Sequence, residues 1–229
     1  MDEKKGIGTL GEKTLHHTLK NYFEPNKEKQ EVRIKKYYAD IYNEKGIIEI
    51  QTQQFYRLRG KLKVFLKEYP VTLVYPVPGK KWLYWLDLES GEISKGRVSP
   101  KKGTYYEICK ELYRIKEYLG DPNLHLHVLI LEIEEYRYLN GWSKDKKKGS
   151  SRCDRIPKKI IEELCIDSRA DYKKLLPKGL PAEFGSYEFA KTAHISRRLA
   201  QITLNILFEV NCVERVQKKG NAWVYQIKV

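Results

Sequence analysis

Residues 37–51, Tyr-Tyr-Ala-Asp-Ile-Tyr-Asn-Glu-Lys-Gly-Ile-Ile-Glu-Ile-Gln, contain the pattern that decides the fold. Two strand-forming runs, 37–42 and 46–51, flank the connection Asn43-Glu44-Lys45-Gly46, whose Asn and Gly favour a tight hairpin turn. A third short run, 31–35, precedes them. The sequence therefore predicts a meander of three antiparallel strands.

The polar residues of this meander fall on one face. Side chains alternate sides along a strand, so Glu49 and Gln51 share one face and the neighbouring isoleucines, Ile48 and Ile50, share the other. A four-residue connection brings Asp40 of the preceding strand beside Glu49. We therefore expect two carboxylates to lie close together on adjacent strands.

Helical and strand patterns surround the meander. A helix is predicted over 9–23, and a second apolar stripe at helical spacing over 55–69 ends at Pro70 before a strand over 71–75. The order is helix, three strands, helix, strand. Further along we expect a hairpin over 82–94, a helix over 104–119 and a strand over 125–133.

The first helix brings a third carboxylate. Its apolar stripe, Leu15 and Leu19, reaches Glu12 when it is extended backwards by three positions, and a carboxylate on an inward face is costly unless a charged group meets it. Glu12, Asp40 and Glu49 would repel one another without a cation between them. Hard oxygen ligands of this kind suit Mg²⁺ or Mn²⁺, and such ions support phosphodiester hydrolysis.

The stretches Gly11-Glu12, 38–41 and 48–52 resemble the PD-(D/E)XK nuclease superfamily across residues 6–76. The sequence motif Ala-Asp-Ile followed by Ile-Glu-Ile-Gln is most similar to the competence protein CoiA-like branch, and the Glu12 helix resembles that of Holliday-junction resolvases. The resemblance implies an α/β fold with a restriction-endonuclease-like core and a mixed sheet. It also implies that Asp40 and Glu49 bind Mg²⁺ or Mn²⁺, that the Ile50 carbonyl assists, and that Glu12 is an accessory ligand.

The third motif position departs from the superfamily pattern. Gln51 stands where Lys is usual, and Gln cannot offer a positive charge to a water or a phosphate. Lys35, Lys61 and Lys63 are candidates to supply that cation, and the spacing does not choose among them. The alternative for the whole motif is that Asp40 and Glu49 are surface residues paired with lysines.

The last fifty residues predict a winged helix-turn-helix. Ser186 caps a short helix through Lys191, a turn follows over 192–195, and Ser196 caps a longer helix. Two strands, 213–217 and 223–228, then flank a hairpin turn. In such proteins the second helix enters the DNA major groove. The predicted DNA contacts are Ser196, Arg197, Arg198, Gln201, Lys218 and Lys219. The alternative is a module that docks onto protein.

The net charge indicates a polyanionic partner. The chain carries a formal charge of +14 with a pI near 9.4, and nucleic acid is attracted to such a field whatever its sequence. Residues 141–155 combine turn formers with a basic run, so we expect a basic linker over 141–165. It would separate a nuclease-like domain over 1–140 from the winged helix over 166–229.

The four cysteines form no C-x-x-C pair and no His completes a zinc site, so neither a disulfide framework nor a structural metal is expected. The first residues lack an apolar signal region, and no apolar run reaches 18 residues. These features predict a cytoplasmic protein with reduced thiols and no membrane partner.

Taken together, the residues favour a metal-dependent DNA endonuclease targeted by its C-terminal module. The alternative is a catalytically inactive nuclease fold that serves as a DNA-binding or regulatory protein, and a homodimer stays open. The four histidines at 16, 17, 125 and 127 lack ligand spacing, so we expect surface or sheet roles for them.

Overall fold

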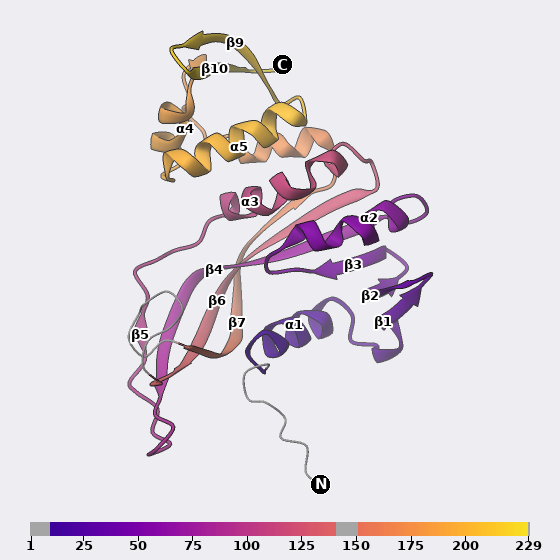
Figure 1. Ribbon diagram of the computed structural model, residues 1–229, viewed down its shortest axis with the longest axis vertical. Helices are drawn as coiled ribbons and strands as arrows, with labels where there is room; N and C mark the ends of the chain where they lie inside the picture. The colour runs from indigo at the N-terminus through magenta and orange to yellow at the C-terminus, as the bar shows by residue number, and fades with distance from the viewer. Residues whose placement is uncertain (1–9, 141–150, 229) are drawn as a thin grey trace.

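The computed structural model describes residues 10–140 and 151–228, with side chains from Thr14 onward. In these ranges a seven-stranded sheet has the order β1-β2-β3-β4-β6-β7, and the short β5 (Arg97–Val98) pairs with β4. Helix α1 (Leu10–Phe23) lies on one face of the sheet, and α2 (Arg59–Phe65) and α3 (Cys109–Leu112) lie on the other (Figure 1). The expected α/β class with a mixed sheet is confirmed.

The predicted meander is present. Strands β1 (Gln30–Ile34), β2 (Tyr37–Asn43) and β3 (Gly46–Ile50) are antiparallel neighbours, and a 3-10 turn, η2 (Lys27–Lys29), precedes them. The turn requires glycine at position 46, because its φ is +101° and a Cβ there would lie 2.4 Å from the Pro70 carbonyl oxygen. The sequence pattern therefore fixed both the strands and their connection.

Strand β4 (Val71–Leu86) is longer than expected. We expected a strand over 71–75 and a separate hairpin over 82–94, but one strand runs through Pro76 and Pro78 into the hairpin. The hairpin itself is present, because the chain turns back after Leu86, bridges Leu86 to Ile93 and pairs Trp82 and Leu83 with β5. The Val74 carbonyl faces β3, where it accepts the Gln51 N–H. Pro76 and Pro78 face the same side of β4 as Val74, but β3 ends before it reaches them. No hydrogen bond to β3 is therefore lost because the prolines lack an N–H group.

The linker expected over 141–165 is wrong where the structure describes it. Residues Ser151–Ile166 form β7, antiparallel to β6 (Leu124–Tyr138), while 141–150 lie outside the described residues. The basic side chains of β7 meet acids on β6: Lys158 pairs with Glu134, and Arg155 pairs with Glu135. Within 151–165, residues that look like a solvated linker in the sequence therefore form an ion-paired strand.

The helix expected over 104–119 is broken into three short pieces. They are η4 (Tyr105–Ile108), α3, and η5 (Tyr113–Tyr118), and inside the last Ile115 leaves the helical region with a φ of −129° while its side chain is fully buried. The stripe expected over 55–69 forms η3 (Phe55–Leu58) and α2. The apolar positions were correct, but a continuous helix was not.

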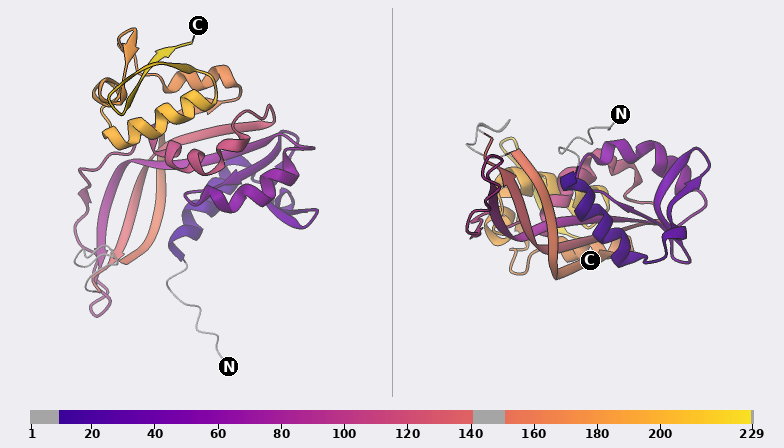
Figure 2. Two further views of the ribbon diagram at one scale, coloured as in Figure 1. Left: turned by 45° about the horizontal axis from the view of Figure 1, so that its top comes forward. Right: turned by 90° about the horizontal axis from the view of Figure 1, so that it is seen from below.

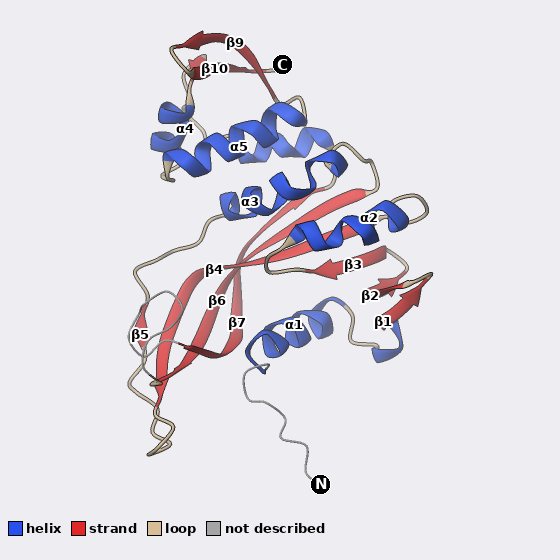
Figure 3. Ribbon diagram, in the orientation of Figure 1, coloured by secondary structure: helices blue, strands red, loops and turns tan. Residues whose placement is uncertain are grey.

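The C-terminal part folds on top of α3 (Figures 1 and 2). Within it, a three-stranded antiparallel sheet has the order β8-β10-β9 and packs on two helices. Its elements are η6 (Arg169–Leu175), β8 (Glu183–Phe184), α4 (Ser186–Thr192), α5 (Arg197–Glu209), β9 (Val213–Lys219) and β10 (Ala222–Ile227). Figure 3 shows the helices of this part gathered between its small sheet and α3.

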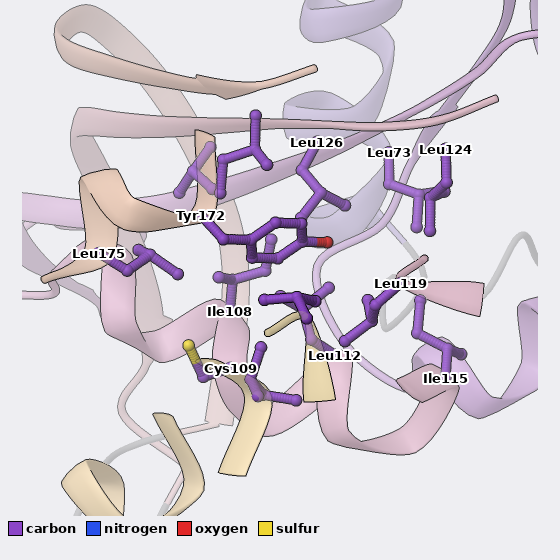
Figure 4. Close-up of a cluster of buried hydrophobic side chains, with 14 of the residues drawn as sticks. Leu73, Ile108, Cys109, Leu112, Ile115, Leu119, Leu124, Leu126, Tyr172 and Leu175 are labelled. Atoms are coloured by element: carbon purple, nitrogen blue, oxygen red, sulfur yellow. The ribbon is translucent and has the colours of Figure 1, made fainter. Parts of the chain in front are cut away.

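One apolar cluster joins the C-terminal part to the large sheet. The Tyr172 ring of η6 lies among side chains of η4, α3 and the sheet, including Ile108, Leu112 and Leu126 (Figure 4). Burial of such a side chain stabilises a fold by about 1.5–3 kcal/mol. Thr203 of α5 is also fully buried, and α5 packs along α3. The helices of the C-terminal part are thus held against the large sheet and α3.

The structure also bears on the cysteines and on membrane-spanning helices. All four cysteines are free thiols, as predicted. Across the part of the chain that the structure describes, no helix combines the length and the apolar character needed to cross a bilayer.

A buried carboxylate holds the long strands together. Glu135 of β6 is fully buried, and its oxygens lie within 4.0 Å of cations from three strands, which are Lys81, Arg137, Arg152 and Arg155. Burial would raise the pKa of Glu135, but the charges of Arg155, Lys81 and Arg137 outweigh it and hold the pKa at about 2. Glu135 is therefore ionised and joins β4, β6 and β7.

We predict that Glu135→Gln lowers the free energy of unfolding by about 3 kcal/mol at pH 7, since removing one partner leaves buried cations unmatched. The control Glu134→Gln, which loses a more exposed pair with Lys158 at 3.5 Å, should cost less than about 1 kcal/mol. Urea denaturation at several pH values measures both.

The pH dependence gives a second check of the same variant. Because the folded pKa of Glu135 is depressed, its contribution is present above pH 4.5 and is lost as the pH falls towards 2. The difference between wild type and Glu135→Gln should shrink across that window. A constant difference would show that the variant acts through packing instead of charge.

Candidate functional site

The two predicted acidic strand residues meet where β2 and β3 stop pairing. The ladder between them ends at the pair Ile41 and Ile48. Beyond that pair, Asp40 Oδ2 accepts the Ile50 backbone N–H at 2.8 Å. A side-chain carboxylate thus takes the place that a strand carbonyl would fill in a continued ladder, and it brings Asp40 next to the residue that follows Glu49.

Asp40 is held in its ionised form. Its Oδ2 also lies 3.1 Å from His16 Nε2 on α1, and its side chain is 16% exposed. Burial would raise the pKa of Asp40, but His16, the Ile50 N–H and the charge of Lys61 hold it below its usual value. Asp40 is therefore a pre-oriented carboxylate fixed between helix and strand.

Glu49 is buried against a lysine from the second helix. Only 2% of the residue is exposed, and Lys61 Nζ donates to both carboxylate oxygens, at 2.9 and 2.8 Å. Burial and the nearby charge of Asp40 raise the pKa of Glu49 to about 7, although Lys61 opposes the shift. The site thus carries a carboxylate whose negative charge is poorly matched.

Three lysines, Lys35, Lys61 and Lys63, were candidates to supply a cation to this site, and Lys61 is the one that reaches it. Lys35 pairs with Glu68, and Lys63 is an exposed residue of α2. Gln51, at the motif position, directs its side-chain Nε2 to the Gln53 carbonyl at 2.6 Å. The cation beside Glu49 therefore comes from α2, while Gln51 shapes the loop that follows β3.

The proposed metal ligands are placed in part. Asp40 and Glu49 converge, and the Ile50 backbone is bound to Asp40. Glu12 lies on α1, but its side chain is outside the described residues. Among the side chains that are described, no group of three His, Cys, Asp or Glu residues could hold a metal ion. Asp40 and Glu49 carry like charges, and a hard divalent cation between them would offset their repulsion.

Sequence reasoning missed His16. We expected a surface role, but the His16 ring is 30% exposed and contacts the Asp40 carboxylate. The available signal was spacing: His16 follows Glu12 by four positions on one helix, so both occupy the same face. The imidazole there orients Asp40 through this contact.

The predicted DNA contacts gather at the start of α5 and at the β9–β10 turn. Ser196 caps α5 by accepting the Leu199 N–H at 3.3 Å. Arg197 and Arg198 are exposed, and Arg197 Nε lies 3.3 Å from the Ser186 hydroxyl of α4. The remaining contacts are also exposed, namely Gln201 on α5 and Lys218 and Lys219 on β9.

Two hollows that share Arg114, together called the basic groove, lie beside α5 and beside the loop after β3. A hollow of about 560 Å³ lies between α5 and the α3–η5 segment, and its lining includes Arg198, Lys110 and Arg114. Arg114 also lines a second hollow of about 440 Å³ with Gln53 and Gln54. These glutamines belong to the loop that Gln51 contacts, so the two hollows link the α5 N-terminus to the end of β3.

Comparison with known proteins places the acidic site within a family. The chain belongs to the family described as a domain of unknown function (DUF8091), whose model matches residues 13–167, from α1 to the end of β7. It is also similar to an uncharacterized protein of Treponema pallidum (strain Nichols), with 33% identity over 160 residues. That match covers 68% of this chain and 61% of the relative, so the chain spans about three fifths of it. No solved structure matches the chain.

We predict that Glu49→Gln makes the protein more stable than wild type at pH 8, by about 2 kcal/mol, and that the gain disappears near pH 5. The folded pKa of Glu49 is raised, so its favourable contribution is present below pH 4.5 and is lost as the pH rises through 7. Glutamine resembles the protonated side chain at every pH.

Chemical denaturation in EDTA at pH 5 and pH 8 measures this difference. The exposed carboxylate Glu28, on η2, provides the control variant Glu28→Gln, which should change stability by less than about 0.5 kcal/mol at both pH values. Destabilisation by Glu49→Gln at both pH values would show instead that the Glu49–Lys61 pair is a net stabilising ion pair.

Proposed function

We propose that this chain is a metal-dependent DNA nuclease whose site consists of Asp40, Glu49 and Lys61. The observation that carries the proposal is the buried Glu49 carboxylate, whose two oxygens bind Lys61 while the charge of Asp40 raises its pKa. Two carboxylates and a lysine on adjacent elements supply the negative ligands and the positive charge that phosphodiester hydrolysis requires.

Each residue has a distinct role in this proposal. Asp40 and Glu49 would hold Mg²⁺ or Mn²⁺, with the Ile50 carbonyl and Glu12 as further ligands. A bound divalent ion polarises a scissile phosphate and activates water. Lys61 would release Glu49 and interact with the phosphate. It would thereby supply the positive charge that the motif lysine of the superfamily supplies, at whose position this chain has Gln51.

The arrangement of elements supports the finer fold assignment. Helix α1, strands β1 to β3, helix α2 and strand β4 follow one another in the order of a restriction-endonuclease-like core. Helices α4 and α5, the turn between them and the β9–β10 hairpin have the order of a winged helix. We therefore propose that the first part cleaves DNA and that the second holds it.

A DNA-binding protein without catalysis is the second candidate. It is favoured by the same pair of hydrogen bonds, because Lys61 occupies both oxygens that a metal would need. The two candidates differ in one respect: a nuclease exchanges this lysine for a cation, and a binding protein keeps it in place.

We predict that Asp40→Asn and Glu49→Gln abolish Mg²⁺- or Mn²⁺-dependent nicking of plasmid DNA, and that Lys61→Gln lowers it by about a hundredfold. The control is Lys63→Gln, an equal loss of charge two residues further along α2 on an exposed side chain, which should leave the rate unchanged. The double variant Lys61→Gln with Gln51→Lys should recover part of the activity, because it returns a lysine to the motif position.

Nicking is measured on supercoiled plasmid with and without EDTA, and circular dichroism checks that each variant is folded. The absence of metal-dependent nicking in the wild-type protein would favour the non-catalytic candidate. Equal rates for the Lys61 and Lys63 variants would remove Lys61 from the site.

We also predict that Arg198→Gln and Arg114→Gln each weaken binding to duplex DNA by about threefold to tenfold, since both line the basic groove. The control Lys95→Gln removes an exposed charge from the segment between β4 and β5 and should have less than a twofold effect. Fluorescence anisotropy at two salt concentrations measures these affinities. If all three variants weaken binding equally, the attraction is diffuse and the groove is not the DNA path.

A further inference from the structure

A second charged group, of the opposite sign to the acidic site, lies on strands β4, β6 and β7 of the same sheet. Lys81, Arg137 and Arg155 all form their ion pairs with one carboxylate, Glu135. Across the described residues, no other carboxylate lies within ion-pair distance of these three cations. Arg152 also lies 3.9 Å from the same carboxylate, so at least three positive charges share one negative charge and at least two are in excess.

Part of this group lines a small cavity. A cavity of about 190 Å³ is bordered by Lys81 and Arg155, by Lys101, and by the hydroxyl-bearing residues Thr52 and Tyr75. The side chains of Lys81 and Arg155 are only 16% and 17% exposed. Partly buried cations in excess are costly unless an anion meets them. The cavity is where such an anion would contact both.

The remaining lining groups are available to a ligand. Lys101 forms no ion pair with any residue that the structure describes. Burial raises the pKa of the Tyr75 phenol, so it stays protonated and can donate a hydrogen bond. Glu107 is the acidic residue of the lining, and its carboxylate pairs with Lys110. The lining thus offers three cations and two hydroxyl groups.

We propose that this cavity binds a phosphate group. A phosphate monoester carries a charge of about −1.5 to −2 at neutral pH, and its oxygens accept several hydrogen bonds, so it matches both the excess charge and the donors. The volume is below the roughly 300 Å³ at which pockets begin to enclose whole drug-sized ligands, which favours a small anionic group. A single carboxylate would leave one positive charge unmatched.

The cavity lies next to the proposed nuclease site in the chain. Thr52 directly follows Gln51, at the end of β3. The phosphate could belong to the end of a nucleic-acid strand or to a free nucleotide or phosphate ion. The proposal concerns binding alone, so it does not depend on cleavage by Asp40, Glu49 and Lys61.

The test measures inorganic phosphate binding to the full chain by isothermal titration calorimetry, in EDTA and at constant ionic strength. Lys101→Gln should weaken binding by about tenfold, because it removes one charge-assisted hydrogen bond. Lys102→Gln removes the neighbouring exposed charge, which does not line the cavity, and should have less than a twofold effect. Lys101 has no part in the Glu135 group, so its loss leaves the fold intact.

Oligonucleotides of one sequence, with a phosphate or a hydroxyl at either end, then identify the source. Tighter binding of a phosphorylated end, reversed by inorganic phosphate and lost in Lys101→Gln, assigns the cavity to strand ends. Equal binding of all oligonucleotides, with phosphate still bound at the cavity, assigns it to a free nucleotide or phosphate. No phosphate binding by the wild-type protein, or equal losses in the Lys101 and Lys102 variants, overturns the proposal. Since EDTA prevents metal-dependent cleavage, none of these results depends on nuclease activity.

Discussion

A negative charge buried in a sheet must find a positive one, and this requirement organises both ends of the large sheet. Glu49 and Glu135 are both buried, yet their pKa values move in opposite directions. Glu135 is surrounded by cations from three strands and stays ionised. Glu49 has one lysine and a neighbouring aspartate, so its charge is incompletely matched. The first arrangement stabilises the fold, and the second is the kind of imbalance that functional sites tolerate.

The same requirement connects the elements in space. Lys61 ties α2 to β3, His16 ties α1 to β2, and Asp40 replaces a ladder bond between β2 and β3. Helices on opposite faces of the sheet therefore converge on one gap in its hydrogen bonding. A ladder that continued past Ile41 and Ile48 would have needed no side chain there.

The sequence predicted what depends on local pattern. Alternation and the turn at Gly46 gave the meander, and helical spacing gave α1 and α5. It could not select Lys61 over Lys63, because that choice depends on which face of α2 turns towards Glu49. It also missed β7, since the acids on β6 that compensate its basic residues lie in a separate stretch of chain. The sequence did not predict that β4 continues through Pro76 and Pro78. The two prolines are tolerated because β3 ends before it reaches them, and where β3 ends is known only from the assembled sheet.

The extent of the family match separates two parts of the proposal. Residues 13–167 include both charged groups, the acidic site at the end of β3 and the basic cavity beside Thr52, whereas α4, α5 and the β9–β10 hairpin follow that range. The proposed metal site and the proposed phosphate cavity would be complementary, because metal-dependent hydrolysis acts on a phosphate group and the cavity offers cations to one. The pairing of these two groups is therefore the reason for proposing phosphate chemistry within residues 13–167, with Arg197 and Arg198 at the start of α5 as a further proposed contact to a long polyanion.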